Sequence, residues 1–454
     1  MPDVAFPTFH LPGVALGELI DFGDGNGNRH ARLRVPSVTP TLLDQAVAAI
    51  TTARDGYLAD LPAKRIVEVI DTAIGRWLEP DYPLRRRAEE LLPAVTGYSM
   101  EMLQQAIPDQ LRAFTADGLI ALVEAELGSL EALDRREGPR LVAHVLAGNI
   151  PAVAAESIVR GLLVKSAGLV KASSRDPLFP ALFAQSLAEV DPQLAAAIAV
   201  VPWKGGNDEL DRAALREADA VIAYGGSSAI EAVRRLTHDD AVFVEHGPRI
   251  SFAAIGREAL TEDRLASLAE DAAWDVSLFD QQGCVAPHAI YVEQDGQITP
   301  FRFAEVLAAA MERFQQRFPR ARLGTEAAAE VQTQRGRWEL LRSADGGPTL
   351  FQSKGSTAWT VVLDNRDVEL RPSCLNRFVR VVPLDDLSAL PAALQGMRPY
   401  LQTAGVATAE EHLPGLSAAL EASGVTRVCG MGTMQYPPAS WRHDGQPNLL
   451  PLLR

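Results

Sequence analysis

Cys284, one of three cysteines in the chain, has the sequence setting of a nucleophile. It follows Gly283 in a polar turn, 279–287, between a helical pattern and the strand-like residues 289–293. A core cysteine normally lies within an apolar run, because it packs as a small hydrophobe. The adjacent glycine has no side chain and leaves room for other groups to approach the sulfur. We therefore predict that this thiol forms covalent acyl or thiohemiacetal intermediates; a loop thiol without a chemical role is the alternative.

Polar residues also end three predicted strands that precede the thiol. Asn149 stands in a turn between a strand and a helix, where its amide would donate to an oxyanion or would only cap the helix. Lys171 ends the next strand and is followed by Ser174 and Arg175, which suit ribose and phosphate contacts; the alternative is a solvated strand end. Glu245 ends a third strand, either as a surface carboxylate or, together with a loop thiol, as a general base.

A glycine-rich turn precedes the helical residues 228–236. Gly225, Gly226 and Ser227 follow a strand directly, so backbone N–H groups and the positive end of the helix dipole favour a pyrophosphate. The segment lacks the G-x-G-x-x-G pattern of a dinucleotide fingerprint, so the prediction rests on the turn and the helix that follows it.

The composition excludes several classes of partner. A net charge of −15 disfavours nucleic acid and anionic membranes, which attract basic surfaces. No apolar run approaches the roughly 20 residues that span a bilayer, and residues 1–5 lack the basic and apolar regions of a secretion signal. The cysteines form no C-x-x-C pair and the histidines no ligand cluster, so we expect no metal site. We expect a cytoplasmic protein with reduced thiols.

The 454 residues are enough for about two or three domains. Residues 1–40 suggest an irregular or β-rich arm, and apolar residues recur at helical spacing over 42–130. Strands then alternate with helices, which indicates parallel βαβ units in a doubly wound sheet. The predicted strands are 141–147, 169–172, 197–203, 218–224 and 241–245, and the helices between them are 152–165, 178–190, 209–217 and 228–236. We expect a cofactor domain within 1–247, a catalytic domain over 248–428 and a tail, 429–454, that packs or oligomerises.

These motifs, in this order, resemble the aldehyde dehydrogenase superfamily: the Asn of an N-x-P turn, the strand-end Lys, the Gly-Ser turn, the Glu-x-Gly turn and the Gly-Cys loop. Two segments resemble more closely the fatty acyl-CoA reductase family of bacterial bioluminescence and its relatives. They are FDQQGC at 279–284 and GMGTMQYPP at 430–438, followed by WRHDG at 441–445. The likeness runs from about residue 140 to the end. It implies an α/β fold with a doubly wound Rossmann-type cofactor domain and a second α/β catalytic domain.

The resemblance implies catalytic roles for three residues. Cys284 would attack a thioester carbonyl and expel CoA. Asn149, with the backbone N–H of Cys284, would stabilise the oxyanion, and hydride transfer would then lead to a free aldehyde. Glu245 matches the base that activates water in the superfamily. Because a reductase must avoid hydrolysis, Glu245 would instead assist the thiol.

The resemblance also implies contacts with a nicotinamide cofactor. Lys171 would contact the adenosine ribose, and residues 225–227 would lie beside the pyrophosphate. NAD-selective members tend to place an acidic residue three positions after the strand-end lysine; here that position is Ser174, followed by Arg175. Since no carboxylate repels a 2′-phosphate and a guanidinium is available to pair with it, we expect NADPH, with NADH as the alternative.

One region departs from the superfamily. Its members carry a Glu-x-Phe-Gly-Pro segment after the nucleophile, whose glutamate binds the nicotinamide ribose, whereas residues 370–378 here lack this segment. Cys374, within that region, and Cys429, at a strand end, are interpreted as structural thiols. A Cys–His–Asp triad that uses His443 and Asp444 is an alternative, but such a hydrolase would not need the βαβ units.

We therefore expect an NADPH-dependent reductase that converts a medium- or long-chain acyl-CoA to the aldehyde through a Cys284 thioester. Two alternatives stay open: oxidation of an aldehyde to an acid or acyl-CoA, and a non-catalytic acyl carrier or partner subunit. The resemblance also implies a partner, an acyl-protein ligase that hands over acyl groups, and, by analogy, a homo-oligomer.

Overall fold

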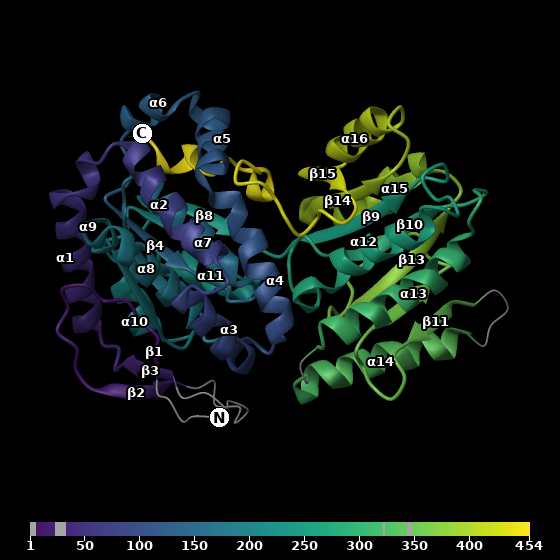
Figure 1. Cartoon of the computed structure of the whole chain (residues 1–454), viewed down its shortest axis with the longest axis horizontal. Helices are drawn as coiled ribbons and strands as arrows, with labels where there is room; N and C mark the ends of the chain where they lie inside the picture. Colours follow the sequence, from purple (N-terminus) through teal and green to yellow (C-terminus); the bar gives the residue numbers. More distant parts are fainter. Residues whose placement is uncertain (1–5, 23–32, 321–322, 343–346) are drawn as a thin grey trace. The chain divides into compact units, whose positions relative to one another are not determined.

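The computed structural model describes residues 6–22, 33–320, 323–342 and 347–454, and the chain divides into two compact units (Figure 1). Unit 1 comprises residues 1–248 together with the C-terminal residues 438–454, and unit 2 comprises residues 249–437. Each unit contains its own largely parallel sheet and its own buried apolar core. The end of the chain thus belongs to the unit that carries the first βαβ region.

Unit 1 is built around a parallel sheet with the strand order β6-β5-β4-β7-β8. Its strands are β4 (Leu141–Val145), β5 (Ala167–Ala172), β6 (Ile198–Pro202), β7 (Ala220–Tyr224) and β8 (Val242–His246). The helices between them are α7 (Pro151–Leu163), α8 (Phe179–Val190), α9 (Pro192–Ala195), α10 (Asp208–Leu215) and α11 (Ser227–Leu236). The strand order reverses between β4 and β7, as in a doubly wound dinucleotide-binding sheet. The α/β prediction is confirmed, and every predicted strand of this sheet is present, with ends that differ by at most two residues.

A small sheet and a group of helices precede β4 in unit 1. The small sheet has the order β1-β3-β2, with β1 (Phe6–Pro7), β2 (Leu19–Phe22) and β3 (Leu33–Pro36). The helices are α1 (Pro40–Gly56), α2 (Ala63–Leu78), α3 (Pro83–Thr96), α4 (Met100–Leu111), α5 (Ala116–Leu127) and α6 (Leu130–Asp134), with 3₁₀ turns η1 (Leu58–Asp60) and η2 (Arg112–Phe114). The prediction of helices over 42–130 matches these elements. The predicted N-terminal arm contributes the small sheet, and its residues 1–5 and 23–32 lie outside the described ranges.

Unit 2 contains a sheet with the order β11-β12-β13-β10-β9-β14-β15, in which β11 alone pairs antiparallel, with β12, among the described strands. Its strands are β9 (Ile250–Ile255), β10 (Pro287–Glu293), β11 (Thr349–Gln352), β12 (Thr360–Leu363), β13 (Phe378–Leu384), β14 (Leu401–Ala407) and β15 (Arg427–Gly430). Its helices are α12 (Leu265–Ser277), α13 (Pro300–Arg317), α14 (Thr325–Arg342), α15 (Leu390–Leu394) and α16 (Leu413–Ala422), with 3₁₀ turns η3 (Leu278–Gln281), η4 (Leu387–Ala389) and η5 (Gln395–Tyr400). Two further 3₁₀ turns, η6 (His443–Gly445) and η7 (Leu450–Leu452), lie in the C-terminal part of unit 1.

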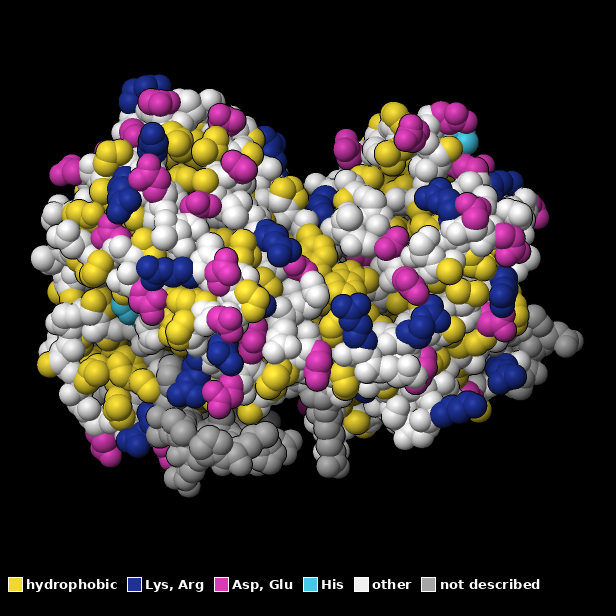
Figure 2. All heavy atoms as spheres, viewed as in Figure 1, with side chains coloured by type: hydrophobic (Ala, Val, Ile, Leu, Met, Phe, Trp, Pro, Cys, Tyr) yellow, Lys and Arg dark blue, Asp and Glu magenta, His cyan; other side chains and the backbone are white. Residues whose placement is uncertain are grey.

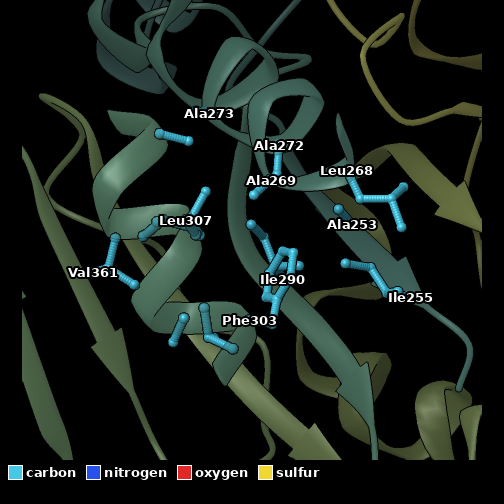
Figure 3. Packing of buried hydrophobic residues seen from close by; sticks show 14 of the residues in the cluster. Ala253, Ile255, Leu268, Ala269, Ala272, Ala273, Ile290, Phe303, Leu307 and Val361 are labelled. Atoms are coloured by element: carbon cyan, nitrogen blue, oxygen red, sulfur yellow. The ribbon is translucent and has the colours of Figure 1, made fainter. Parts of the chain in front are cut away.

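Apolar side chains fix α12 and α13 on the sheet of unit 2 (Figure 3). Ala269 of α12 packs in the same buried cluster as Ile290 of β10, and Phe303 and Leu307 of α13 join Val361 of β12 there. Burial of a side chain as large as Leu or Phe stabilises a fold by about 1.5–3 kcal/mol. This core therefore holds the end of α12, from which the Cys284 segment departs.

Charged side chains of both signs are interspersed over the face shown in Figure 2. In the described part of the chain, no helix combines the length and the apolar character that crossing a bilayer requires.

Gly148, in the turn between β4 and α7, is required by its backbone conformation and by close neighbours. Its φ is +69°, a left-handed value that favours glycine. A Cβ at this position would lie 2.6 Å from Ser173 Cβ and 2.9 Å from the backbone nitrogen of Asp176. The turn that carries Asn149 therefore depends on close contact between the β4 and β5 ends of the sheet.

Replacing Gly148 with Ala should lower the free energy of unfolding by more than the roughly 1 kcal/mol cost of a left-handed residue, because the added carbon also meets backbone. Chemical denaturation measures this change. Gly75→Ala is the matched control, since Gly75 lies inside α2 with no atom within 4 Å of an added Cβ, and it should be neutral or stabilising. Equal stability of the two variants would contradict the described turn.

Candidate active site

Cys284 lies in unit 2, between the end of η3 and the start of β10. Its side chain is partly exposed, and none of the three cysteines, all of which are described, takes part in a disulfide. Ser251 Oγ, on β9, donates a 2.7 Å hydrogen bond to the Cys284 carbonyl. Gln402 Nε2, on β14, donates to the sulfur at 3.5 Å. Two strands of the sheet therefore position the thiol.

A left-handed turn leads into the Cys284 loop. Phe279, Asp280 and Gln281 have φ values of 49°, 53° and 65°, and none of them is glycine. For residues with a Cβ, this conformation costs about 1–2 kcal/mol each. All three side chains are buried, so surrounding contacts must hold the turn in place.

Arg377 provides the strongest of these contacts. Its guanidinium is fully buried, and its Nε donates to Asp280 Oδ1 at 2.8 Å. It also donates to Gln315 Oε1 at 2.7 Å and to the Phe318 carbonyl at 2.9 Å, so its donors are well satisfied. Burial raises the pKa of the Asp280 carboxyl, while the charge of Arg377 acts in the opposite direction. The ion pair thus ties the Cys284 turn to the loop before β13.

A second left-handed run meets the first. Leu375, Asn376 and Arg377 have φ values of 59°, 60° and 62°. The Asn376 N–H donates to the Asp280 carbonyl at 3.1 Å. Gln281 accepts from the Phe378 N–H at 2.9 Å and donates to the Phe378 carbonyl at 3.0 Å. The segment 370–378, for which the sequence offered no role, therefore contains the clamp that holds the turn before Cys284.

Asn149 and residues 225–227 lie on the two sides of the switch point of the unit 1 sheet. Asn149 follows β4, and its carbonyl accepts from the Tyr98 hydroxyl at 2.6 Å. Gly226 is the N-cap of α11, and both Gly226 and Ser227 are exposed. Ligands of doubly wound sheets bind at this edge, and a helix N-terminus attracts anions. The geometry of this turn therefore suits a pyrophosphate.

Lys171, at the end of β5, faces a carboxylate of its own unit. Its Nζ lies 2.5 Å from Asp211 Oδ1, which also accepts from Trp203 Nε1 at 2.8 Å. Arg175 is exposed, and its backbone N–H donates to Ser173 Oγ at 3.2 Å. The roles of Lys171, Ser174 and Arg175 toward a cofactor stay predictions.

Glu245, on β8, forms an ion pair with Arg234 of α11, with 2.6 Å between Oε2 and Nη2. Both side chains are nearly half exposed, at 45% and 48%. The Glu245 carboxylate therefore faces a guanidinium of its own unit. Asn149 and Glu245 belong to unit 1 and Cys284 to unit 2, so the roles of both toward the thiol stay predictions.

The segment 430–436 packs on the end of α12, and this helix directly precedes the Cys284 loop in the sequence. Asp275 of α12 is fully buried and accepts from the N–H groups of Gly432 at 2.6 Å and Met434 at 3.1 Å. Burial raises the pKa of Asp275 to about 8. Gly432 has a φ of +82°, and a Cβ there would lie 2.7 Å from Asp271 Oδ1. Gly432 is therefore required by its left-handed backbone and by its close fit against α12.

The chain matches a known protein family. The family described as "Acyl-CoA reductase (LuxC)" matches residues 58–454. The chain belongs to this family.

Curated relatives carry the same kind of name. The chain is 27% identical over 303 residues to the long-chain acyl-protein thioester reductase of Vibrio harveyi, covering 63% of this chain and 61% of the relative. It is 30% identical over 290 residues to the protein of that name from Photorhabdus luminescens, covering 61% and 57%. The matched part thus spans about three fifths of these relatives.

Solved structures show the same fold. Aldehyde dehydrogenase 21 of Physcomitrella patens superposes with a TM-score of 0.73 at 14% identity, covering 99% of this chain and 97% of that one. An aldehyde dehydrogenase of Mycobacterium tuberculosis, determined in complex with NAD+, gives 0.67 at 18% identity, covering 92% and 88%. The chain therefore has the aldehyde dehydrogenase fold, as its sequence motifs predicted.

Residues 441–445, the second half of the C-terminal motif, belong to unit 1 and contact the end of β8. Asp444 Oδ2 accepts from His246 Nδ1 at 3.0 Å, and the His443 ring stacks on that of His246 with centroids 4.2 Å apart. His443 Nδ1 also lies 3.4 Å from Glu156 Oε1. Burial lowers the pKa of His246 to about 4. His443 and Asp444 thus hold the end of β8, next to Glu245.

A group of three buried side chains has the spacing of metal ligands. The possible ligand atoms of His246, His443 and Asp444 all lie within 4.8 Å of one another. The Arg160 guanidinium lies 3.4 Å from His246 Nε2 and opposes a cation at this place. The absence of a metal stays a prediction from the sequence.

Two residues of the site, Gln402 and Arg377, were not identified from the sequence. Gln402 lies in a mostly apolar strand next to another polar residue, Thr403, and Arg377 lies 97 residues after its partner Asp280. The sequence shows only that Asp280 and Arg377 are charged residues of opposite sign in two irregular segments.

Replacing Arg377 with Met should destabilise unit 2 by about 3–5 kcal/mol, because the Asp280 carboxylate would remain buried without its partner. Chemical denaturation at pH 7 measures the loss. Arg371→Met is the matched control: Arg371 pairs with Asp367 at 57% exposure, so its loss should cost about 0–1 kcal/mol. A similar, small effect of both substitutions would show that the Arg377 clamp does not hold the fold.

Proposed function

We propose that this chain is an NADPH-dependent acyl thioester reductase that takes a medium- or long-chain acyl group onto Cys284 and releases the aldehyde. The observation that carries the proposal is the setting of Cys284, a partly exposed thiol on a clamped turn with an amide donor at its sulfur. Membership of the acyl-CoA reductase family and the name of the relatives support the same chemistry.

The reaction requires a thiol that serves first as nucleophile and then as leaving group. The Cys284 thiolate attacks the thioester carbonyl, its S–C bond forms, and the thiolate of the donor leaves and takes up a proton. After reduction of the acyl carbon, the thiohemiacetal collapses, the carbonyl re-forms, and the electron pair of the S–C bond returns to Cys284. The net reaction consumes an acyl thioester, NADPH and a proton and yields an aldehyde, a free thiol and NADP+.

The residues of unit 1 fit a nicotinamide dinucleotide. When bound, this cofactor supplies the hydride. The turn 225–227, which is exposed at Gly226 and Ser227, would bind its pyrophosphate, and Arg175 would pair with a 2′-phosphate. Asp176 directs its carboxylate inward, where it accepts from the N–H groups of Leu178 and Phe179 and is 2% exposed. A phosphate beside Arg175 would therefore not face that carboxylate.

The donor is a thioester of CoA or of a protein. Cys284 would attack the same thioester carbonyl in both donors. The two donors differ in the size of the leaving group. The relatives are named for acyl-protein donors. We propose that an acyl-protein ligase is a partner that hands over acyl groups and that acyl-CoA is accepted as well.

Cys284→Ala should abolish both NADPH oxidation and release of the donor thiol while leaving NADPH affinity unchanged. Mixing purified protein with acyl-CoAs of increasing length, or with an acylated ligase, and NADPH measures both signals. Cys374→Ala is the matched control, because burial raises the pKa of that thiol to about 11 and it should retain full activity.

Three outcomes would contradict the proposal. Turnover by Cys284→Ala would exclude the nucleophile. Release of the donor thiol without NADPH oxidation would indicate an acyl carrier. Reduction of NADP+ with an aldehyde, but no reverse reaction with any thioester, would indicate an aldehyde-oxidising enzyme.

Arg175→Asp should raise the KM for NADPH about tenfold while changing the KM for NADH much less, because only NADPH carries the 2′-phosphate. Arg86→Asp makes the same charge change on an arginine that is 68% exposed in unit 1, and should alter neither constant. An equal effect of Arg175→Asp on both cofactors would remove the basis for NADPH selectivity.

A further inference from the structure

Gln402 is a buried amide in contact with the sulfur of Cys284. It lies near the start of β14, with no exposed surface, in a strand whose other side chains are mostly apolar. Its Nε2 donates to the Cys284 sulfur at 3.5 Å. Burying an amide is costly unless its hydrogen bonds are made, so a glutamine at this position calls for a physical reason.

Thr426, the residue before β15, holds the backbone of Gln402 in place and also contacts its amide oxygen. The Gln402 carbonyl accepts from the Thr426 N–H at 2.9 Å, and the Thr426 hydroxyl lies 3.0 Å from that carbonyl and 3.5 Å from Gln402 Oε1. Ser251 Oγ accepts from the Thr403 N–H at 3.1 Å and donates to the Cys284 carbonyl. The donor and the sulfur are therefore fixed by the same sheet, which limits the reorganisation needed during a reaction.

Arg427, at the start of β15, is held by backbone carbonyls of the segment that follows this strand. Arg427, next to Thr426, donates to the carbonyls of Met434 at 2.7 Å and Thr433 at 3.0 Å. Burial lowers the pKa of Arg427, and the charges of Cys429, Asp275 and Cys284 act to raise it.

We propose that Gln402 is a catalytic residue, whose amide N–H donates to the Cys284 sulfur whenever that sulfur carries negative charge. This inference rests on the proposed role of Cys284 as the nucleophile. The thiolate exists twice in each cycle: before the S–C bond to the acyl carbon forms, and after the thiohemiacetal has released the aldehyde and the electron pair has returned to sulfur. Gln402 gives up no proton in either step, because a neutral amide only shares its hydrogen.

Alkylation of Cys284 by iodoacetamide tests this proposal, since the thiolate is the reacting species and no acyl group or cofactor is needed. The background variant carries Cys374→Ala and Cys429→Ala, so that only Cys284 reacts. Adding Gln402→Met keeps a buried side chain of similar length but removes the donor. At pH 7 the alkylation rate should fall about tenfold, as expected for losing a hydrogen bond to a charged group, and the difference should shrink at pH 10.

Two further variants separate a catalytic role from a structural one. Thr426→Val leaves the amide present but removes the hydroxyl beside it, and should slow alkylation only about twofold. Gln402→Leu repeats the test with a different apolar side chain and serves if the Met variant does not fold, as judged by its unfolding transition. Unchanged alkylation at pH 7 in a folded Gln402 variant would overturn the proposal.

Failure of this inference can be distinguished from failure of the proposed function. If Gln402→Met alkylates like its background while Cys284→Ala abolishes acyl reduction, the function stands and the role of Gln402 is wrong. If Gln402→Met slows alkylation but Cys284→Ala still reduces acyl thioesters, the donor is real and the proposed function is wrong.

Discussion

The buried ion pair between Arg377 and Asp280 is the interaction on which the proposed chemistry depends. The turn of Phe279, Asp280 and Gln281 is left-handed at three residues that have a Cβ, and such a turn is unfavourable by itself. The guanidinium neutralises the buried Asp280 carboxylate, and removing either partner would leave a charge that the interior cannot stabilise. Strain in the turn is thereby offset by contacts outside it, and Cys284 follows in a defined position.

The segment 279–284 and the residues 430–436 of the C-terminal motif lie in the same region of unit 2. Asp275 binds the backbone of residues 432 and 434 at the end of α12, and the chain runs from that helix through η3 to Cys284. Gln402 of β14 donates to the Cys284 sulfur, and Thr426, the residue before β15, donates to the Gln402 carbonyl. One end of a helix and one pair of strands therefore determine both the path of the loop and the surroundings of its sulfur.

The sequence was sufficient for the architecture and for the residues that follow strands. Alternation of apolar strands and helices located β4 to β8, and the turns at Asn149 and at 225–227 flank the switch point because they follow β4 and β7. Left-handed turns without glycine have no sequence marker, so the turn before Cys284 could not be predicted. Pairs such as Lys171 with Asp211 and Gln402 with Cys284 are separated by 40 and 118 residues, and their meeting depends on tertiary packing that no local pattern records.

The most direct test of the account is to identify the acylated residue. Protein incubated with a long-chain acyl-CoA without NADPH is quenched in acid, digested and analysed by mass spectrometry, and a parallel sample receives NADPH before quenching. We predict an acyl group on the Cys284 peptide that disappears when NADPH is added, with one aldehyde formed for each adduct lost. An adduct on another residue, or loss of the Cys284 adduct as free acid regardless of NADPH, would contradict it.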